Sequence, residues 1–389
     1  MMPTTFYLDA NATTPPLPEA VAQMVAAMQQ YWANPSSPHD AGQRSKQVLM
    51  SARADVARFL GCKPAEVVFT SGATEATHLA LRGALRMGAR RRLLISVAEH
   101  ASARKLAQTL HDQALADVSW LGIRADGSLN TDTLNDLLDE HVAVVSVMAA
   151  NNETGVLMPV DALAQQVHAV GALLHVDATQ WVGKLPFDFS RCGADLVSLS
   201  AHKFGGPKGV GALLVRQGLS LPALFDGSQE RGRRGGTENL PGIVGMAAAA
   251  RAHERSPQAW QLQTQYITTL RDALEAGLCA RLPGVVVFGQ SQPRLPNTSY
   301  LRIGLWHAEV VLQRLAQLGV MAASGSACAS TGQAPSAVLT AMGVPKEQAL
   351  CAVRLSLLPD ATQAQIDQLL EQFPPMLEPA PSIPTGVFA

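Results

Sequence analysis

A lysine stands where a short apolar run passes into a glycine-rich segment. Lys203 lies in S-A-H-K-F-G-G-P-K-G-V-G, residues 200–211, directly after the run at 195–199. A lysine amine can form a Schiff base with a carbonyl group, and the carboxyl end of a strand is where open α/β sheets bind ligands. Glycines there let the backbone pass close to a bulky ligand. Taken alone, the segment is also compatible with an ordinary lysine in a surface loop.

Asp177 ends another apolar run, Leu173–Val176, earlier in the chain. A carboxylate at that place can keep the nitrogen of a heteroaromatic ring protonated, which makes the ring an electron sink for a carbanion. The alternative is an aspartate that caps the helix following the strand.

A third candidate is the segment V-F-T-S-G-A-T-E, residues 68–75, which combines a strand, a glycine turn and a helix start. Backbone N–H groups and the helix dipole can bind a phosphate at such a place, and Gly72, Ala73 and Thr74 form the predicted cradle. The segment lacks the pattern G-x-x-x-x-G-K-[ST], which disfavours a P-loop nucleotidase. Because serine and threonine near a helix start are often only caps, this segment alone stays ambiguous.

Cys328 lies in a run of small residues, A-S-G-S-A-C-A-S-T-G, at 323–332. We expect such a run to pack poorly and to move, which suits a thiolate that attacks a substrate and then carries a group away. The five cysteines are irregularly spaced without a C-x-x-C pair, which argues against a disulfide framework and a zinc site. Most of the others are expected to be reduced thiols in or near the core. These others are Cys62, Cys192, Cys279 and Cys351.

The elements that must position these residues follow from the hydrophobic pattern. Short β-branched runs alternate with longer helical patterns, which indicates an α/β fold, and runs that are apolar throughout are typical of parallel strands covered on both faces. A smaller second region is predicted after an alanine-rich helix from about Leu240 through Ala252, and the proline-rich end is expected to be extended or disordered. The predicted strands are Val67–Thr70, Leu93–Val97, Val142–Val147, Leu173–Val176, Asp195–Leu199 and Gly209–Val215, then Val285–Phe288 and Ser299–Ile303, with helices near 308–318 and 361–372.

Composition places the chain among soluble globular proteins. It has 389 residues, of which 47% are hydrophobic and 16% charged, and a formal net charge of -1. A nearly neutral chain has no long-range field to attract nucleic acid or an anionic membrane, so neither is expected as a partner. The first residues lack a signal-peptide pattern, and no run approaches the roughly 18 apolar residues of a spanning helix, so we expect a cytoplasmic protein.

Together these segments resemble the NifS/IscS-like cysteine desulfurases, which are class V aminotransferases among the fold-type I pyridoxal-phosphate enzymes. The resemblance covers nearly the whole chain. It implies an α/β fold with a large cofactor-binding domain around a mostly parallel seven-stranded sheet and a smaller α+β domain. The implied boundaries are 16–258 for the large domain, 1–15 with 259–375 for the small domain that carries Cys328, and 376–389 for a flexible tail. The segments that carry the resemblance are 7–14, 71–75, 99–100, 151–155, 175–180, 202–203, 230–232, 237–239 and 324–328.

The resemblance implies roles around pyridoxal 5'-phosphate. Lys203 would bind the cofactor covalently, Asp177 would pair with the ring nitrogen, and His100 would stack on the ring and move protons. Without the resemblance, a satisfied core histidine would be the better interpretation of His100. Thr237 would reach the phosphate of the neighbouring subunit in a homodimer, and no metal is implied. The implied cofactor contacts are Gly72, Ala73, Thr74, His100, Asn152, Asp177, Gln180, Ser200, His202, Lys203 and Thr237.

The implied activity is conversion of L-cysteine to L-alanine. The sulfur would remain as a persulfide on Cys328 and pass to an acceptor, for example an iron–sulfur cluster scaffold protein. Arg354 would clamp the substrate carboxylate, a task that suits its planar fork, with Asn34 and Asn152 as further substrate contacts.

Two alternatives and two departures accompany this interpretation. A selenocysteine lyase or a related class V aminotransferase would share Lys203 and Asp177, although the S-G-S-A-C form at 324–328 resembles the group with a long sulfur-carrying loop more closely. The alternative of another class is an inactive scaffold protein of the same fold. The chain departs from the family pattern at Leu358 and Pro359, where glycine usually follows, and at 226–229, which is usually richer in glycine.

Overall fold

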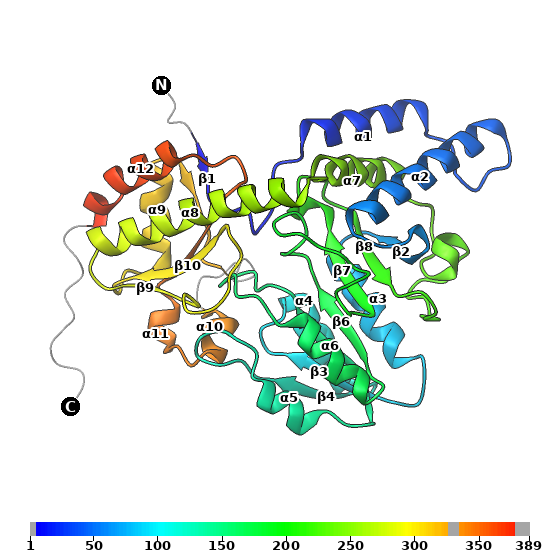
Figure 1. Cartoon of the computed structure of the whole chain (residues 1–389), viewed down its shortest axis with the longest axis horizontal. Coiled ribbons are helices and arrows are strands. Elements are labelled where there is room, and N and C mark those ends of the chain that lie inside the picture. The colour runs from blue at the N-terminus through cyan, green and yellow to red at the C-terminus, as the bar shows by residue number, and fades with distance from the viewer. Residues whose placement is uncertain (1–4, 326–333, 378–389) are drawn as a thin grey trace.

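A seven-stranded sheet forms the larger part of the molecule in the computed structural model, which describes residues 5–325 and 334–377 (Figure 1). Its strand order is β2-β8-β7-β6-β5-β3-β4. β8 runs antiparallel to both neighbours, and the other neighbouring pairs are parallel. This confirms the predicted α/β fold with a mostly parallel sheet. The strands are β2 (Val67–Thr70), β3 (Arg92–Ser96), β4 (Asp117–Leu121), β5 (Val142–Met148), β6 (Leu173–Asp177), β7 (Leu196–Ser200) and β8 (Gly211–Val215).

Helices cover both faces of this sheet, which explains why most of its strands are largely apolar and buried. Every residue of β2, β5, β7 and β8 is buried. One core contains Leu79 of α3 and Leu106 of α4, whereas the other contains Val56 of α2, Val167 of α6 and Ile243 of α7. The helices of this part are α1 (Pro18–Gln30), α2 (Asp40–Phe59), α3 (Ala73–Leu85), α4 (Ala101–Asp112), α5 (Thr131–Leu137), α6 (Val160–Ala169) and α7 (Leu240–Ala252).

The smaller part has a core of its own. Phe6 and Leu8 of the N-terminal segment join residues between 267 and 377 in that core, and α8 extends from the larger part into the smaller one (Figure 1). The separate core supports the proposed division into 16–258 and 259–375 with 1–15, which stays a prediction. The strands are β12 (Ala352–Ser356), β10 (Thr298–Ile303) and β9 (Val285–Val287), antiparallel in that order, and the parallel pair β1 (Phe6–Tyr7) and β11 (Val320–Met321). The helices are α8 (Pro257–Arg281), α9 (Ala308–Gln317), α10 (Ala337–Ala341), α11 (Lys346–Ala349) and α12 (Gln363–Gln372).

Four strands, β1, β4, β11 and β12, have no counterpart among the predicted ones. β1 and β11 contain two residues each, β4 is an edge strand with four of its five residues at least partly exposed, and β12 includes the charged Arg354. A 3-10 helix spans Pro374–Leu377 and so includes the first two residues of the tail predicted at 376–389, whose boundary stays a prediction. Residues 378–389 lie outside the described part.

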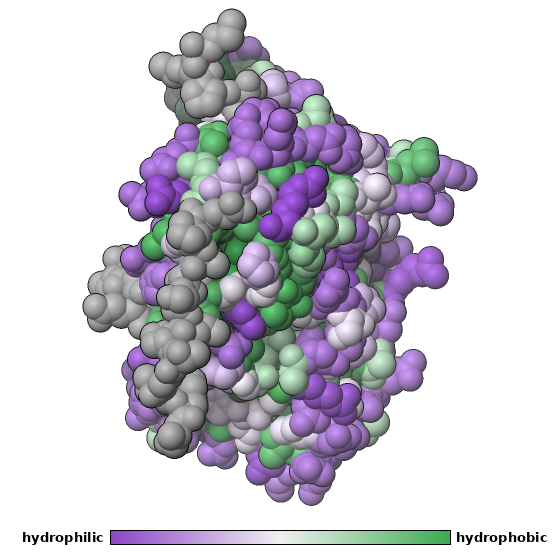
Figure 2. All heavy atoms as spheres, turned by 90° about the vertical axis from the view of Figure 1, so that its left-hand side faces the viewer, coloured by the Kyte–Doolittle hydropathy of each residue, from purple (hydrophilic) through white to green (hydrophobic). Residues whose placement is uncertain are grey.

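The surface of the smaller part is mixed in character. Figure 2 shows hydrophilic side chains around its rim and hydrophobic ones gathered toward the middle of the same face. Such a surface is usual, since apolar atoms contribute more than half of the accessible area of folded proteins. Within 5–325 and 334–377, no helix is long and apolar enough to cross a membrane.

Candidate active site

The carboxyl ends of five strands meet along one edge of the large sheet. The residues at these ends, which come from β2, β3, β5, β6 and β7 and the segments after them, line a cavity of about 410 Å³, here called the sheet-edge cleft. Because parallel strands end at the same edge, residues far apart in sequence converge there. The structure thereby brings together most of the predicted site. The predicted residues that line the cleft are Gly72, Ala73, Thr74, His100, Asn152, Asp177, Gln180, Ser200, His202 and Lys203.

Lys203 ends a short 3-10 turn that directly follows β7. Its Nζ donates hydrogen bonds to the backbone oxygens of Asn11 at 2.6 Å and Ala12 at 2.7 Å. Burial, with the positive charge of Arg354 as the next cause, lowers the pKa of Lys203 to about 8. An amine with this pKa is a far better nucleophile near neutral pH than an ordinary lysine.

Asp177 and His100 supply a carboxylate and an imidazole to the same cleft. Asp177 is 8% exposed, and its Oδ1 accepts a hydrogen bond from the backbone N–H of Thr179 at 2.9 Å. His100 caps α4, with its Nδ1 accepting from the backbone N–H of Ser102 at 3.2 Å. Desolvation by the cleft walls, partly offset by the charge of Asp177, lowers the pKa of His100. An imidazole that is neutral near pH 7 can accept a proton and pass it on.

The end of the cleft near α3 is suited to an anion. The N-cap residue Gly72 offers no side-chain cap to α3, whose first residue is Ala73. A Cβ at position 72 would lie 3.6 Å from Ser200 Oγ, so the turn and this hydroxyl are close neighbours. Burial lowers the pKa of His202 to about 4, which keeps its ring neutral. The helix dipole, with Thr74, Ser200 and His202 around it, can therefore hold a phosphate.

Arg354 reaches the site from β12 in the smaller part. The residue is 2% exposed, and its Nη2 donates to Asp9 Oδ1 at 2.7 Å. Its Nη1 donates to the backbone oxygen of Asn152 at 3.0 Å, and Asn152 also lines the sheet-edge cleft. The guanidinium therefore stands at the border between the cleft and the smaller part, where its fork could bind a carboxylate.

Two of the predicted residues that the structure describes, Asn34 and Thr237, do not line the cleft of this chain. Asn34 is exposed, and its Oδ1 accepts from the backbone N–H of Ser36 at 2.8 Å. Thr237 is also exposed and does not line the cleft. Its contact with a neighbouring subunit and the contact of Asn34 with substrate stay predictions. Cys328 lies outside the described residues.

The four described cysteines are poor candidates for a nucleophile. All four are free thiols, and Cys279 is exposed while the others are half-buried or buried. Desolvation is the main cause that raises the pKa of each thiol, to about 12 for Cys62. A thiol with a raised pKa carries little of the reactive thiolate at neutral pH.

Asn11 contacts Lys203, and Lys184 contacts Asn11 and Gln180, although the sequence indicates no role for either residue. The backbone oxygen of Asn11 accepts from Lys203 and from Gln180 Nε2, the latter at 2.9 Å. Its Oδ1 accepts from Lys184 Nζ at 2.8 Å, and its Nδ2 donates to Thr298 Oγ1 at 2.9 Å. These partners are 169 to 287 residues away in sequence, so no local pattern could have revealed them.

The two departures from the family pattern leave these contacts in place. At the first departure, the backbone oxygen of Pro359 accepts from Gln263 Nε2 at 2.9 Å, so α8 holds the altered turn. At 226–229, the Oε1 of Gln229 accepts from the backbone N–H of Gly236 at 3.0 Å. Both segments are thus hydrogen-bonded to nearby segments of the same chain, and neither lines the sheet-edge cleft.

Comparison with known proteins decides the family. The family model described as Aminotransferase class-V matches residues 6–369. The chain belongs to this family. A cysteine desulfurase of Cereibacter sphaeroides is 42% identical over 375 residues, which cover 96% of this chain and 95% of that protein. A solved NifS-like protein has a TM-score of 0.87 at 31% identity and covers 96% of this chain and 99% of its own. A structure titled SspA in complex with cysteine has a TM-score of 0.79 at 28% identity, covering 92% and 100%.

Class-V aminotransferases use pyridoxal phosphate, and the sheet-edge cleft fits this cofactor. Lys203 supplies an amine of lowered pKa, Asp177 a buried carboxylate, and the uncapped N-terminus of α3 an anion site within one cavity. An aldehyde, a ring nitrogen and a phosphate are the groups that these three features bind. The predicted family, fold and cofactor are thereby confirmed.

Proposed function

We propose that this class-V aminotransferase is a cysteine desulfurase that converts L-cysteine to L-alanine and retains the sulfur as a persulfide on Cys328. The observation that carries the proposal is the convergence of Lys203, Asp177 and His100 in one cleft with Arg354 at its border. Relatives named cysteine desulfurase, 42% and 40% identical over 96% of this chain, support the same chemistry.

Different residues of the cleft would bind different groups of the cofactor. When bound, pyridoxal phosphate supplies an aldehyde for amines and a ring that accepts electrons from a neighbouring carbon. Lys203 would attach to it, Asp177 would keep a proton on the ring nitrogen, and the start of α3 with Ser200 and His202 would hold the phosphate. His100 would pack against the ring.

The substrate would be oriented by Arg354 and deprotonated by Lys203. Arg354 would bind the carboxylate of L-cysteine in exchange for part of its contact with Asp9, which lies 2.7 Å away. Lys203, displaced by the amine of the substrate, would take the proton from Cα, since a pKa of about 8 lets an amine accept and return protons near neutral pH. His100 would move the further protons that alanine requires.

The sulfur transfer balances without an external oxidant or reductant. The thiolate of Cys328 attacks Sγ of the substrate, a sulfur–sulfur bond forms, and the carbon–sulfur bond breaks with its electron pair left on the carbon skeleton. Protonation of that skeleton gives alanine. One L-cysteine and one Cys328 thiol therefore become one L-alanine and one Cys328 persulfide.

We further propose a cytoplasmic homodimer that passes the sulfur to acceptor proteins, for example an iron–sulfur cluster scaffold. In this dimer Thr237 of one subunit would reach the phosphate site of the other. The exposure of Thr237 and its position outside the cleft of its own chain support that part of the proposal.

Incubation of the purified protein with L-cysteine and a reductant tests the activity. Alanine and sulfide should appear in equal amounts, whereas pyruvate or another keto acid would point to a different class V reaction. Cys328→Ala should abolish sulfide release and keep the visible band of the cofactor, while Cys279→Ala, at an exposed cysteine, should behave like the unmodified protein. Unchanged sulfide release from the Cys328 variant would refute the persulfide step. A protein that forms no visible band with pyridoxal phosphate would instead be an inactive scaffold.

A further inference from the structure

Lys184 is a half-buried lysine that no step of the proposed reaction uses. Its Nζ donates to Asn11 Oδ1 at 2.8 Å and to Gln180 Oε1. None of the ion pairs within 5–325 and 334–377 includes Lys184. Burial of its amine, followed by the charges of Lys203 and Arg354, lowers the pKa of Lys184 well below the usual value. Burying an amine without a carboxylate partner costs free energy. A role for the contacts with Asn11 and Gln180 would explain why the chain places a lysine there.

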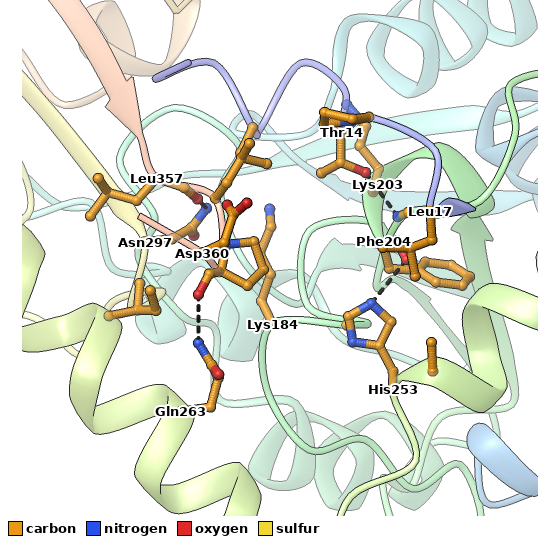
Figure 3. Close-up of a pocket in the computed structure, with 18 of the residues that line it drawn as sticks. Thr14, Leu17, Lys184, Lys203, Phe204, His253, Gln263, Asn297, Leu357 and Asp360 are labelled. Carbon is orange, nitrogen blue, oxygen red and sulfur yellow. Dashed lines mark hydrogen bonds between the residues drawn. The ribbon is translucent and has the colours of Figure 1, made fainter. Parts of the chain in front are cut away.

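Gln180 lies between Lys184 and the sheet-edge cleft. Gln180 lines that cleft, whereas Lys184 lines a second cavity of about 410 Å³ that shares only Lys203 with the first. Figure 3 shows Lys184 and Lys203 in the wall of this second cavity. Lys184 therefore approaches the amide of Gln180 from outside the cleft.

The contacts of Gln180 fix which way its amide points. Its Oε1 accepts from Lys184 Nζ, and its Nε2 donates to the backbone oxygen of Asn11 at 2.9 Å. If the amide were reversed, its NH2 group would face the N–H donors of Lys184 and its oxygen would face the carbonyl of Asn11. The two oxygens would then repel each other, and the Lys184 amine would lose the acceptor to which it donates. In the observed orientation Nε2 keeps a second N–H, which has no partner among residues 5–325 and 334–377.

We propose that Lys184 is a positioning residue that fixes the amide of Gln180 so that an N–H donor, and not the carbonyl oxygen, faces the bound cofactor. The donor would meet an oxygen substituent of the pyridoxal phosphate ring. The inference rests on the proposed cofactor site, but it requires no reaction with L-cysteine.

The test uses cofactor binding by the full-length protein in the absence of substrate. Lys184→Met keeps the length of the side chain and removes every donor. We expect it to weaken the binding of pyridoxal phosphate to the cofactor-free protein by about three- to tenfold, the value of one net hydrogen bond. The pH at which the visible band of the bound cofactor titrates should also shift, because the ring oxygen loses its fixed donor. Lys184→Gln, which keeps a donor, should recover part of both effects.

A double-mutant cycle separates positioning from a merely structural role. If Lys184 acts through Gln180, adding Lys184→Met to Gln180→Ala should cause no further loss of affinity and no further shift of the band. An equal loss in both backgrounds would overturn the proposal, and so would a Lys184→Met protein with unchanged affinity and band. The melting temperature of each cofactor-free variant shows whether it folds, and Lys184→Gln provides the same comparison if the methionine variant does not.

The outcomes for Lys184 and for the proposed function are distinguishable. If the protein forms the band but makes no alanine from L-cysteine, the proposed function is refuted. The double-mutant cycle of Lys184 and Gln180 could still be measured. A protein that forms no band at all would refute the cofactor site and the role of Lys184 together.

Discussion

The amine of Lys203 should titrate near pH 8 in the cofactor-free protein and thereby set the rate of cofactor attachment. Burial is the main cause of the lowered pKa, and the charge of Arg354 adds to it. Only a neutral amine attacks an aldehyde. At pH 7 about 9% of Lys203 would be neutral, against about 0.03% for a lysine with the ordinary pKa of 10.5, a difference of roughly 300-fold. The attachment rate should rise about tenfold per pH unit below pH 8 and level off above it.

Rapid mixing of the cofactor-free protein with pyridoxal phosphate measures this rate through the growth of the visible band. The two histidines of the cleft are not expected to titrate near pH 8, because burial lowers the pKa of His100 from its ordinary value and that of His202 to about 4. The phosphate of the cofactor also titrates below pH 8, since a phosphate monoester has its second pKa at about 6. Lys203→Ala gives the background from attachment to other lysines. Arg354→Met removes a positive charge near the amine and leaves Asp9 unpaired, so the inflection should move to higher pH.

Two results would refute this reasoning about Lys203. A rate that still rises tenfold per unit up to about pH 10 would mean that the amine titrates like an ordinary lysine. A rate independent of pH would mean that the protonation of Lys203 does not limit attachment. An inflection that stays in place in the Arg354 variant would leave burial as the sole cause of the shift.

Two further predictions concern stability. Glu230→Gln should lower the free energy of unfolding in urea by about 3–5 kcal/mol. Arg53 donates to both oxygens of Glu230, at 2.6 and 2.8 Å, and would keep a buried charge without its partner. A loss below about 1 kcal/mol would contradict this view of the pair. Burial and the charge of Asp177 raise the pKa of Glu99 well above its usual value, so the folded state retains a proton that the unfolded chain releases as the pH rises through the ordinary carboxyl range. The stability that Glu99 contributes should therefore fall as the pH rises, so the slope of melting temperature against pH should be less negative in Glu99→Gln than in the unmodified protein. Equal slopes in the two proteins would contradict the assignment.

The sequence predicts the parts of the site that are encoded locally. β5, β6 and β7 are mostly apolar runs; Asp177 ends β6, and Lys203 ends the short turn that follows β7, so pattern and position together indicate both residues. The partners of Arg354 could not be predicted in this way. Its contacts with Asp9 and Asn152 span 345 and 202 residues, and a charged residue within β12 interrupts the apolar run that would have indicated a strand.

Contacts of this long-range kind also show what the smaller part contributes to the site. The backbone N–H of Asn11 donates to Ser356 Oγ at 3.0 Å on β12, and its Nδ2 donates to Thr298 Oγ1 at 2.9 Å on β10. The carbonyl of this same residue accepts from Lys203 at 2.6 Å. Because Arg354 also belongs to β12, the acceptor of the lysine amine and the expected clamp for the substrate carboxylate are fixed to one small sheet. A shift of that sheet relative to the larger part would change both at once, so the geometry of proton transfer at Lys203 depends on the packing of the smaller part as well as on the strand that carries the lysine.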